Sequence, residues 1–188
     1  MMIRKAEFED IPILEWLIPE SVRTLQARDY SPEQMEGALG TVFGVDRQLI
    51  RDGTYFVVEI DSRIVACGGW SRRKTLFGSD HAPGKDDAWL DPSVEPARIR
   101  AFFVHPEWAR RGIGSLLMRA SEEAAAAEGF SSLELVATLT GEPLYRAHGF
   151  QGVEWFDVAL PNGARLPVVR MRKEVGSHGR LLDAFTAE

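Results

Sequence analysis

The sequence predicts a single α+β domain, in which helices flank a mostly antiparallel sheet. Strand-like segments occur in pairs across short turns, first at residues 55–60 with 64–70 and again at 153–160 with 165–173, and such pairs form antiparallel hairpins. Between the hairpins, apolar residues recur at steps of three and four over residues 113–127, which indicates an amphipathic helix. With 188 residues, the chain is long enough to bury one substantial core.

Composition narrows the class of protein. The chain is 45% hydrophobic and 27% charged, which is typical of a globular protein, and its formal net charge of −6 argues against nucleic-acid binding. Cys67 is the only cysteine, so that neither an internal disulfide nor a cysteine-rich metal site is expected, and we read it as a buried strand residue. No apolar run approaches the roughly 18 residues that cross a bilayer, and the start shows no signal peptide. We therefore expect a cytoplasmic protein that does not enter membranes.

Two helices are predicted before the first hairpin. The first covers about residues 10–25, because an acidic pair and an early proline precede an apolar run, and Pro19 is expected to break or kink it. The second begins at residues 31–34, where serine, proline and glutamine stand at the positions that favour a capped start. It should end around residues 40–44, which contain two glycines.

A long polar segment at residues 72–96 separates the first hairpin from a strand at 99–104. It is rich in Gly, Pro and Asp, and loops of this length inside a compact domain are usually functional or disordered. The segment carries more acidic than basic side chains. Two interpretations stay open, namely a solvated loop and an acidic lid that would favour a cationic amine.

Further elements follow the amphipathic helix. We predict a strand at 133–137, a short helix at 143–148, and a turn at 161–163 (Pro-Asn-Gly) inside the second hairpin. Residues 176–188 have the composition of a loose tail or a partner-docking segment. The predicted organisation is therefore one domain over 1–175 and a C-terminal tail.

A glycine turn at the start of the amphipathic helix is a candidate anion-binding site. Helix starts expose backbone N–H groups without internal partners, Gly112 and Gly114 allow close approach, and Arg110 and Arg111 add positive charge. The dinucleotide fingerprint is excluded because Leu117 stands where it needs a third glycine, and no P-loop lysine is present. By itself, the turn indicates only an anion-binding helix start.

Residues 102–117 (FFVHPEWARRGIGSLL) resemble motif A of the GNAT acetyltransferases, and residues 144–150 (LYRAHGF) resemble their motif B. The order and separation of the two motifs also match, and the resemblance covers roughly Met2 to Lys173. It implies the GNAT fold, with a mixed, mostly antiparallel sheet splayed around the cofactor. The opening would be V-shaped and would lie between the strand of Phe102 and the strand of Leu133.

The resemblance implies acetyl-CoA as cosubstrate and no metal. The first three residues of motif A would pair through their backbone with the pantetheine arm and the acetyl carbonyl, and the amides of the turn would take the diphosphate. Ala109 departs from the Gln or Arg that is usual in the family, which we expect to shift affinity rather than abolish binding. The predicted cofactor-binding residues are Phe102, Phe103, Val104, Ala109, Arg110, Arg111, Gly112, Ile113, Gly114 and Ser115.

Tyr145 occupies the motif B position that commonly protonates the departing thiolate, and a phenol with an ordinary pKa near 10 keeps its proton at neutral pH. Its alternative role is packing. Thr138 stands where many relatives carry an Asn, and its hydroxyl is not assigned a role. The general base is not identified, because the strand before motif A carries Arg98 and Arg100 and no carboxylate. The resemblance also implies that water alone can deprotonate the amine. The side chains considered for that role are Asp80, His81, Asp86, Asp87 and Glu134.

The function expected from both motifs is direct transfer of an acetyl group from acetyl-CoA to a primary amine. The alternative is a catalytically silent acyl-CoA-binding or sensory module, which the missing base keeps open. A small-molecule amine is the expected partner, and a homodimer is compatible with the sequence. A polyamine, an amino-acid-like metabolite, an aminoglycoside and a protein N-terminus remain open as acceptors.

Overall fold

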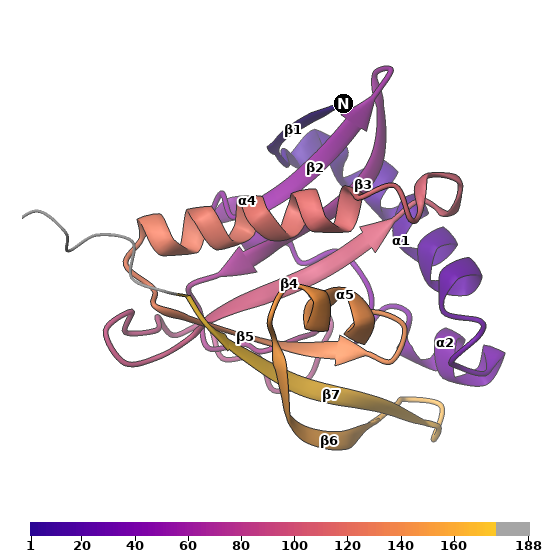
Figure 1. The fold of residues 1–188 in the computed structure, drawn as a ribbon. Helices are drawn as coiled ribbons and strands as arrows, with labels where there is room; N and C mark the ends of the chain where they lie inside the picture. The colour runs from indigo at the N-terminus through magenta and orange to yellow at the C-terminus, as the bar shows by residue number, and fades with distance from the viewer. Residues whose placement is uncertain (176–188) are drawn as a thin grey trace, which may run out of the picture.

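A computed structural model describes residues 1–175, so that the predicted tail at 176–188 lies outside the described residues. Within that range the strands form one sheet in the order β1-β2-β3-β4-β5-β7-β6 (Figure 1). The strands are β1 (Met2–Lys5), β2 (Tyr55–Ile60), β3 (Arg63–Ser71), β4 (Ala97–Val104), β5 (Ser132–Thr138), β6 (Gln151–Ala159) and β7 (Arg165–Glu174). The helices are α1 (Ile11–Leu25), α2 (Pro32–Ala38), α3 (Arg47–Arg51), α4 (Ile113–Ala127) and α5 (Glu142–Ala147), with 3-10 turns η1 (Phe8–Asp10) and η2 (Pro106–Trp108).

The sheet is antiparallel except where β4 meets β5. These two strands run parallel and pair only at Ala97 with Leu133 and at Arg98 with Glu134. Beyond those residues they diverge, and Figure 1 shows them apart at their C-terminal ends, near α5. The V-shaped opening that the resemblance implied is therefore present, and the α+β fold with a mixed, splayed sheet is confirmed.

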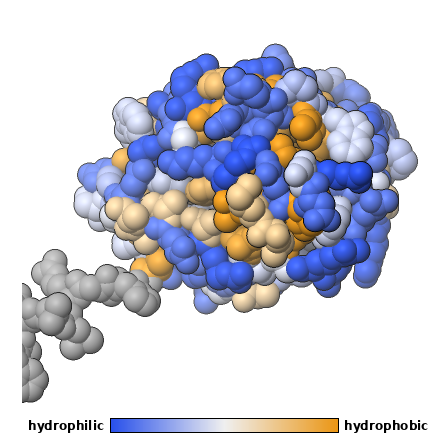
Figure 2. Space-filling view, turned by 90° about the horizontal axis from the view of Figure 1, so that it is seen from above, coloured by the Kyte–Doolittle hydropathy of each residue, from blue (hydrophilic) through white to orange (hydrophobic). Residues whose placement is uncertain are grey.

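Helices cover both faces of the sheet, with α4 in front of it and α1 behind it in Figure 1. The hydrophobic cluster behind the sheet, here called the α1-side cluster, includes Leu14, Val22, Tyr55 and Phe103. On the other face, the α5-side cluster contains Met118, Leu133, Ala137 and Phe150. Seen from above, the surface is mostly hydrophilic, with hydrophobic residues gathered in patches between hydrophilic ones (Figure 2).

Most predicted elements are found, with three differences. Pro19 lies inside α1 without breaking it, because Leu17, Ile18 and Val22 on either side are almost fully buried and their packing outweighs one lost hydrogen bond. Sequence reasoning also missed β1 and α3. Both are very short, so neither shows a hydrophobic period that could be recognised.

A bulge in β4 shapes the strand beside the opening. Ala101 has a left-handed φ of +55°, and the pairing shifts so that Ala101 and Phe102 together oppose Gly68. A Cβ atom on Gly68 would stand 2.4 Å from the Phe102 ring, so only glycine fits there. The hydroxyl of Tyr55 donates to the Ala101 carbonyl at 2.8 Å, and burial raises the pKa of this phenol, which stays neutral. The bulge is therefore held from behind by a buried side chain.

The long segment at 72–96 is tied to the sheet by a buried guanidinium. Arg100 is 3% exposed and donates to Asp46 at 2.9 Å, to the Gly78 carbonyl at 2.7 Å and to the Thr75 carbonyl at 3.0 Å. Lys85 adds a second ion pair to Asp46 at 2.9 Å. The segment contains no helix or named strand, as predicted, yet its middle is anchored rather than loose.

Tyr30, which follows α1, joins distant parts of the chain. Its hydroxyl donates to the Pro167 carbonyl of β7 at 2.6 Å and accepts from the amide of Leu139, just after β5, at 2.9 Å. Burial raises the pKa of Tyr30 to about 12, so that the phenol keeps the proton that it donates. This side chain fixes the N-terminal helices against the C-terminal half of the sheet.

Neither a membrane-crossing helix nor a metal-binding cluster occurs within residues 1–175. No helix there has the length and apolar character to cross a membrane, and no three His, Cys, Asp or Glu side chains gather as metal ligands would. Cys67 is buried as predicted, and burial raises the pKa of its thiol to about 12.

Replacing Asp46 with alanine should lower the free energy of unfolding by about 3–5 kcal/mol, because it leaves the Arg100 charge buried without its partner. The matched control is Glu36→Ala, which removes the exposed ion pair with Arg23 and should change the free energy of unfolding far less, because solvent screens both charges. Urea unfolding of both variants measures the difference. Equal losses in the two variants would contradict the anchoring role of Asp46.

Candidate active site

The glycine turn forms an anion-binding start of α4. Gly112 caps the helix with a φ of +81°, a left-handed conformation that favours glycine. The first backbone hydrogen bond of the helix is donated by the Leu116 amide to the Gly112 carbonyl at 3.0 Å. The six amides at 110–115 donate to no acceptor within the described chain, so all of them are free to bind an anion.

Charged and polar side chains surround these amides. Arg110 and Arg111 are exposed, and the Arg111 guanidinium lies over the Trp108 ring at 4.8 Å. Ser115 Oγ lies 2.9 Å from Nε2 of His148, which caps the end of α5. Burial lowers the pKa of His148, so the imidazole is neutral at pH 7. The ring nitrogen and the Ser115 hydroxyl therefore form a hydrogen bond between two neutral groups. From the sequence, His148 beside motif B could be read only as a capping or packing residue, because the pattern does not show that α5 meets the first turn of α4.

Backbone edges of β4 and β5 line the opening. The amide of His105 donates to Val65 of β3 at 2.8 Å, and because residues alternate along a strand, Phe102 and Val104 direct their backbone groups toward the gap. The Val104 amide already donates to Ser21 Oγ of α1 at 3.3 Å. The Phe103 ring packs behind the sheet, 6.1 Å from the Phe43 ring. That all three predicted residues bind cofactor stays a prediction.

Tyr145 stands on α5 beside the gap. Its partly buried ring lies between Phe102, at 6.2 Å, and Phe150, at 6.1 Å, measured between ring centroids. Burial raises the pKa of the phenol, and its hydroxyl takes part in no hydrogen bond within residues 1–175. Thr138 Oγ1 accepts from the Gly141 amide at 3.1 Å, and so supports the start of α5. The phenol is therefore neutral at pH 7, and packing against the two rings holds it in place.

Two of the carboxylates considered as bases, Glu134 and Asp80, are held in ion pairs. Glu134 is 3% exposed and binds Arg98 and Arg170 at the closed end of the opening, away from α5. Asp80 binds Arg47 at 2.5 Å. Neither is a free base beside Tyr145.

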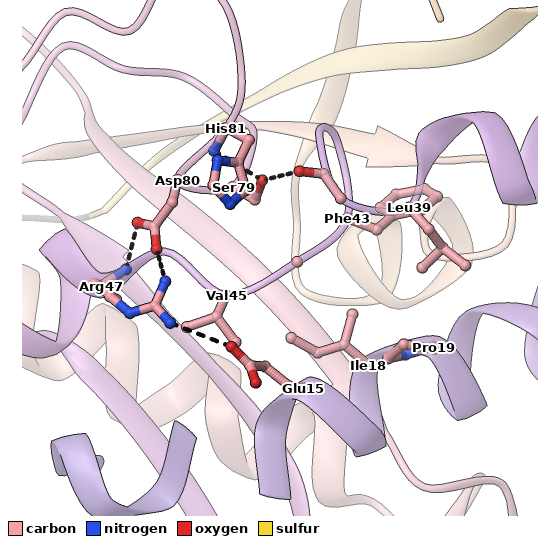
Figure 3. Close-up of a pocket in the computed structure, with 12 residues that line it drawn as sticks. Glu15, Ile18, Pro19, Leu39, Phe43, Val45, Arg47, Ser79, Asp80 and His81 are labelled. Carbon is pink, nitrogen blue, oxygen red and sulfur yellow. Dashed lines mark hydrogen bonds and ion pairs between the residues drawn. The ribbon is translucent and has the colours of Figure 1, made fainter. Parts of the chain in front are cut away.

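The remaining base candidates lie in the long loop. Figure 3 shows Arg47 between Asp80 and Glu15, on the wall of a cavity of about 200 Å³ that His81 also lines. This cavity belongs to the α1 side of the sheet, whereas Tyr145 packs on the other side. Asp86 accepts from the Ala88 amide at 3.0 Å, and Asp87 is exposed.

The structure places a turn of amides without internal partners at the rim of a splayed sheet, which is the arrangement that the resemblance to motifs A and B implied. The acetyltransferase (GNAT) domain matches residues 51–152. The chain therefore belongs to the GNAT family, and its chemistry is acyl transfer.

Solved structures support the same fold. A GCN5-related N-acetyltransferase from Rhodopseudomonas palustris is 20% identical with a TM-score of 0.70, over 93% of this chain and 95% of that one. PaiA N-acetyltransferase from Thermoplasma acidophilum, in complex with coenzyme A, is 16% identical with a TM-score of 0.62, over 92% and 98%. A ribosomal-protein-alanine N-acetyltransferase from Brucella melitensis is 17% identical with a TM-score of 0.62, over 93% and 100%. Comparison with curated proteins gives no significant match.

Replacing Gly112 with glutamate should weaken binding of CoA at least tenfold, because the new side chain puts a negative charge among amides that would face phosphate. Gly163→Glu is the matched control. Gly163 has a similar φ of +87°, and open space surrounds both positions, so both variants carry the same backbone strain. Calorimetry with CoA measures both affinities. Unchanged binding in Gly112→Glu would contradict the assignment of the turn.

Proposed function

We propose that the protein transfers an acetyl group from acetyl-CoA to a primary amine. The observation that carries this proposal is the turn of six free amides beside an opening lined by two strand edges. Membership of the GNAT family supplies the acyl transfer. A similar fold in a structure complexed with coenzyme A supports a CoA-type cosubstrate.

The residues present fit such a cosubstrate. The amides at 110–115 and the exposed Arg110 and Arg111 would hold the diphosphate, since an anion at a helix start meets both N–H donors and positive charge. The strand edges at Phe102 and Val104 would accept an extended pantetheine arm as an added strand does. Ala109 supplies only backbone at the place where relatives carry a longer side chain.

In the proposed reaction, the neutral amine nitrogen attacks the thioester carbonyl carbon, the new C–N bond forms, and the C–S bond breaks. Tyr145 gives its proton to the leaving sulfur, and the resulting phenolate regains a proton from solvent. The proton lost by the amine passes to water. What supports a route through water is that Glu134 and Asp80 are bound to arginines.

The alternative function is a silent module that binds acyl-CoA without turnover. The same ion pairs favour it, because they occupy Glu134 and Asp80, two of the carboxylates considered as bases. Release of free thiol from acetyl-CoA across a panel of amines separates the two functions. Tight cofactor binding with no thiol release on any amine would support the module.

Replacing Tyr145 with phenylalanine should lower kcat about a hundredfold or more, because the leaving thiolate loses its proton donor. The KM for acetyl-CoA and the melting temperature should stay nearly constant, since the ring contacts with Phe102 and Phe150 remain.

The pH profile provides a second test of Tyr145. Its pKa is raised above the ordinary value near 10, so the phenol stays protonated and the wild type should lose no rate through phenol ionisation between pH 7 and 9. Steady-state kinetics over this range measures both enzymes. A variant with full rate at every pH would show that the tyrosine only packs.

A further inference from the structure

The short helix α5 rests on the anion-binding start of α4. Leu144 and His148 are four residues apart, so their side chains lie on the same side of α5 and its C-terminal cap. Leu144 covers Gly114, where an added Cβ atom would stand 2.9 Å from Leu144 Cδ2. His148 Nε2 lies 2.9 Å from Ser115 Oγ. Within residues 1–175, this is the only side-chain hydrogen bond that joins α5 or its cap to α4, and it reaches the turn of free amides.

The Ser115 hydroxyl is placed to meet an anion at this turn. Ser115 is partly exposed and lies in the first turn of α4. Bonds from Cα to Cβ in a helix tilt toward its N-terminus, so this side chain leans over the amides that have no internal partner. A serine hydroxyl has one hydrogen to donate, and it can accept another hydrogen bond at the same time. It can therefore donate to a phosphate oxygen only if His148 does not take that hydrogen.

The tautomer of His148 decides where that hydrogen goes. A neutral imidazole carries one N–H group, on Nδ1 or on Nε2. With the hydrogen on Nδ1, Nε2 accepts from Ser115, and the hydroxyl has no hydrogen left for a ligand. With the hydrogen on Nε2, the ring donates to Ser115 Oγ, and the hydroxyl can donate to phosphate. A bound diphosphate would select the second arrangement, because only that one completes a chain of donors that ends on the anion.

The charges around His148 leave this choice to the hydrogen bond. Arg119 and Glu122 of α4 and Lys173 of β7 are the charged groups that act on the ring. Glu122 accepts from Lys173 at 2.8 Å, so two of these charges largely cancel. Burial lowers the pKa of His148, and the ring is therefore neutral before an anion binds. His148 thus acts on the turn through its hydrogen bond rather than through a positive charge.

We propose that His148 is a positioning residue of the cofactor site, which holds the Ser115 hydroxyl as a hydrogen-bond donor to the diphosphate of the CoA-type cosubstrate. The inference rests on the proposed function and adds to its binding site a side chain from the end of α5. Because Tyr145 lies on α5, the same contact connects the diphosphate turn to the helix that carries the phenol.

The test measures the affinity for CoA by calorimetry, which requires no turnover. His148→Leu and Ser115→Ala should each weaken CoA binding about tenfold, because the diphosphate loses a donor. His148→Gln should stay within about threefold of the wild type, since its side-chain amide can donate to Ser115 Oγ. Ser93→Ala is the matched control and should leave the affinity unchanged. It also removes a serine hydroxyl bond, to Asp91 at 2.6 Å, but in the segment that precedes β4, whereas the turn follows that strand.

The double variant with both His148→Leu and Ser115→Ala separates a positioning role from a general structural one. If His148 acts through Ser115, the double variant should bind CoA no more weakly than either single variant. Additive losses, unchanged affinity in His148→Leu, or an equal loss in His148→Gln would each overturn the assignment of His148. A wild type that binds CoA but releases no thiol with any amine would overturn acetyl transfer alone. A wild type that does not bind CoA would overturn both proposals.

Discussion

The site depends on the incomplete pairing of β4. This strand is hydrogen-bonded to β3 along most of its length but meets β5 at only two positions, so backbone groups of both strands remain available to a ligand. Unpaired backbone is costly inside a protein, and the opening persists because it is held on both sides. Arg98, Glu134 and Arg170 clamp its closed end, and Tyr55 fixes the bulge on β4.

The same strand also organises the opposite face through Arg100. Its guanidinium donates hydrogen bonds to Asp46 and to two carbonyls of the long segment. A stretch without regular secondary structure therefore has a defined path. Negative charges near that segment are largely used to hold the fold together. Asp80, for example, is bound to Arg47 and so contributes to the fold.

Sequence patterns predicted what depends on neighbouring residues. The hairpins, α4 and the turn at Gly112 can each be predicted from residues close together in the sequence. The splayed sheet was predicted only because residues 102–117 resemble motif A. Contacts between distant residues could not be predicted in this way. The burial of Arg100 depends on Asp46, 54 residues away, and the role of His148 depends on a contact with Ser115 across 33 residues.

The bond from Tyr30 to Pro167 has a consequence for how the protein is made. It joins residues 137 positions apart, and the neighbouring bond to Leu139 spans 109. A ribosome releases the chain from its N-terminus, so α1 and α2 leave the exit tunnel long before their partners in β7 exist. Closure of such long loops is slow, and the N-terminal helices must wait for the last hairpin before their final packing forms. The final packing of α1 and α2 is thus delayed until β7 has emerged.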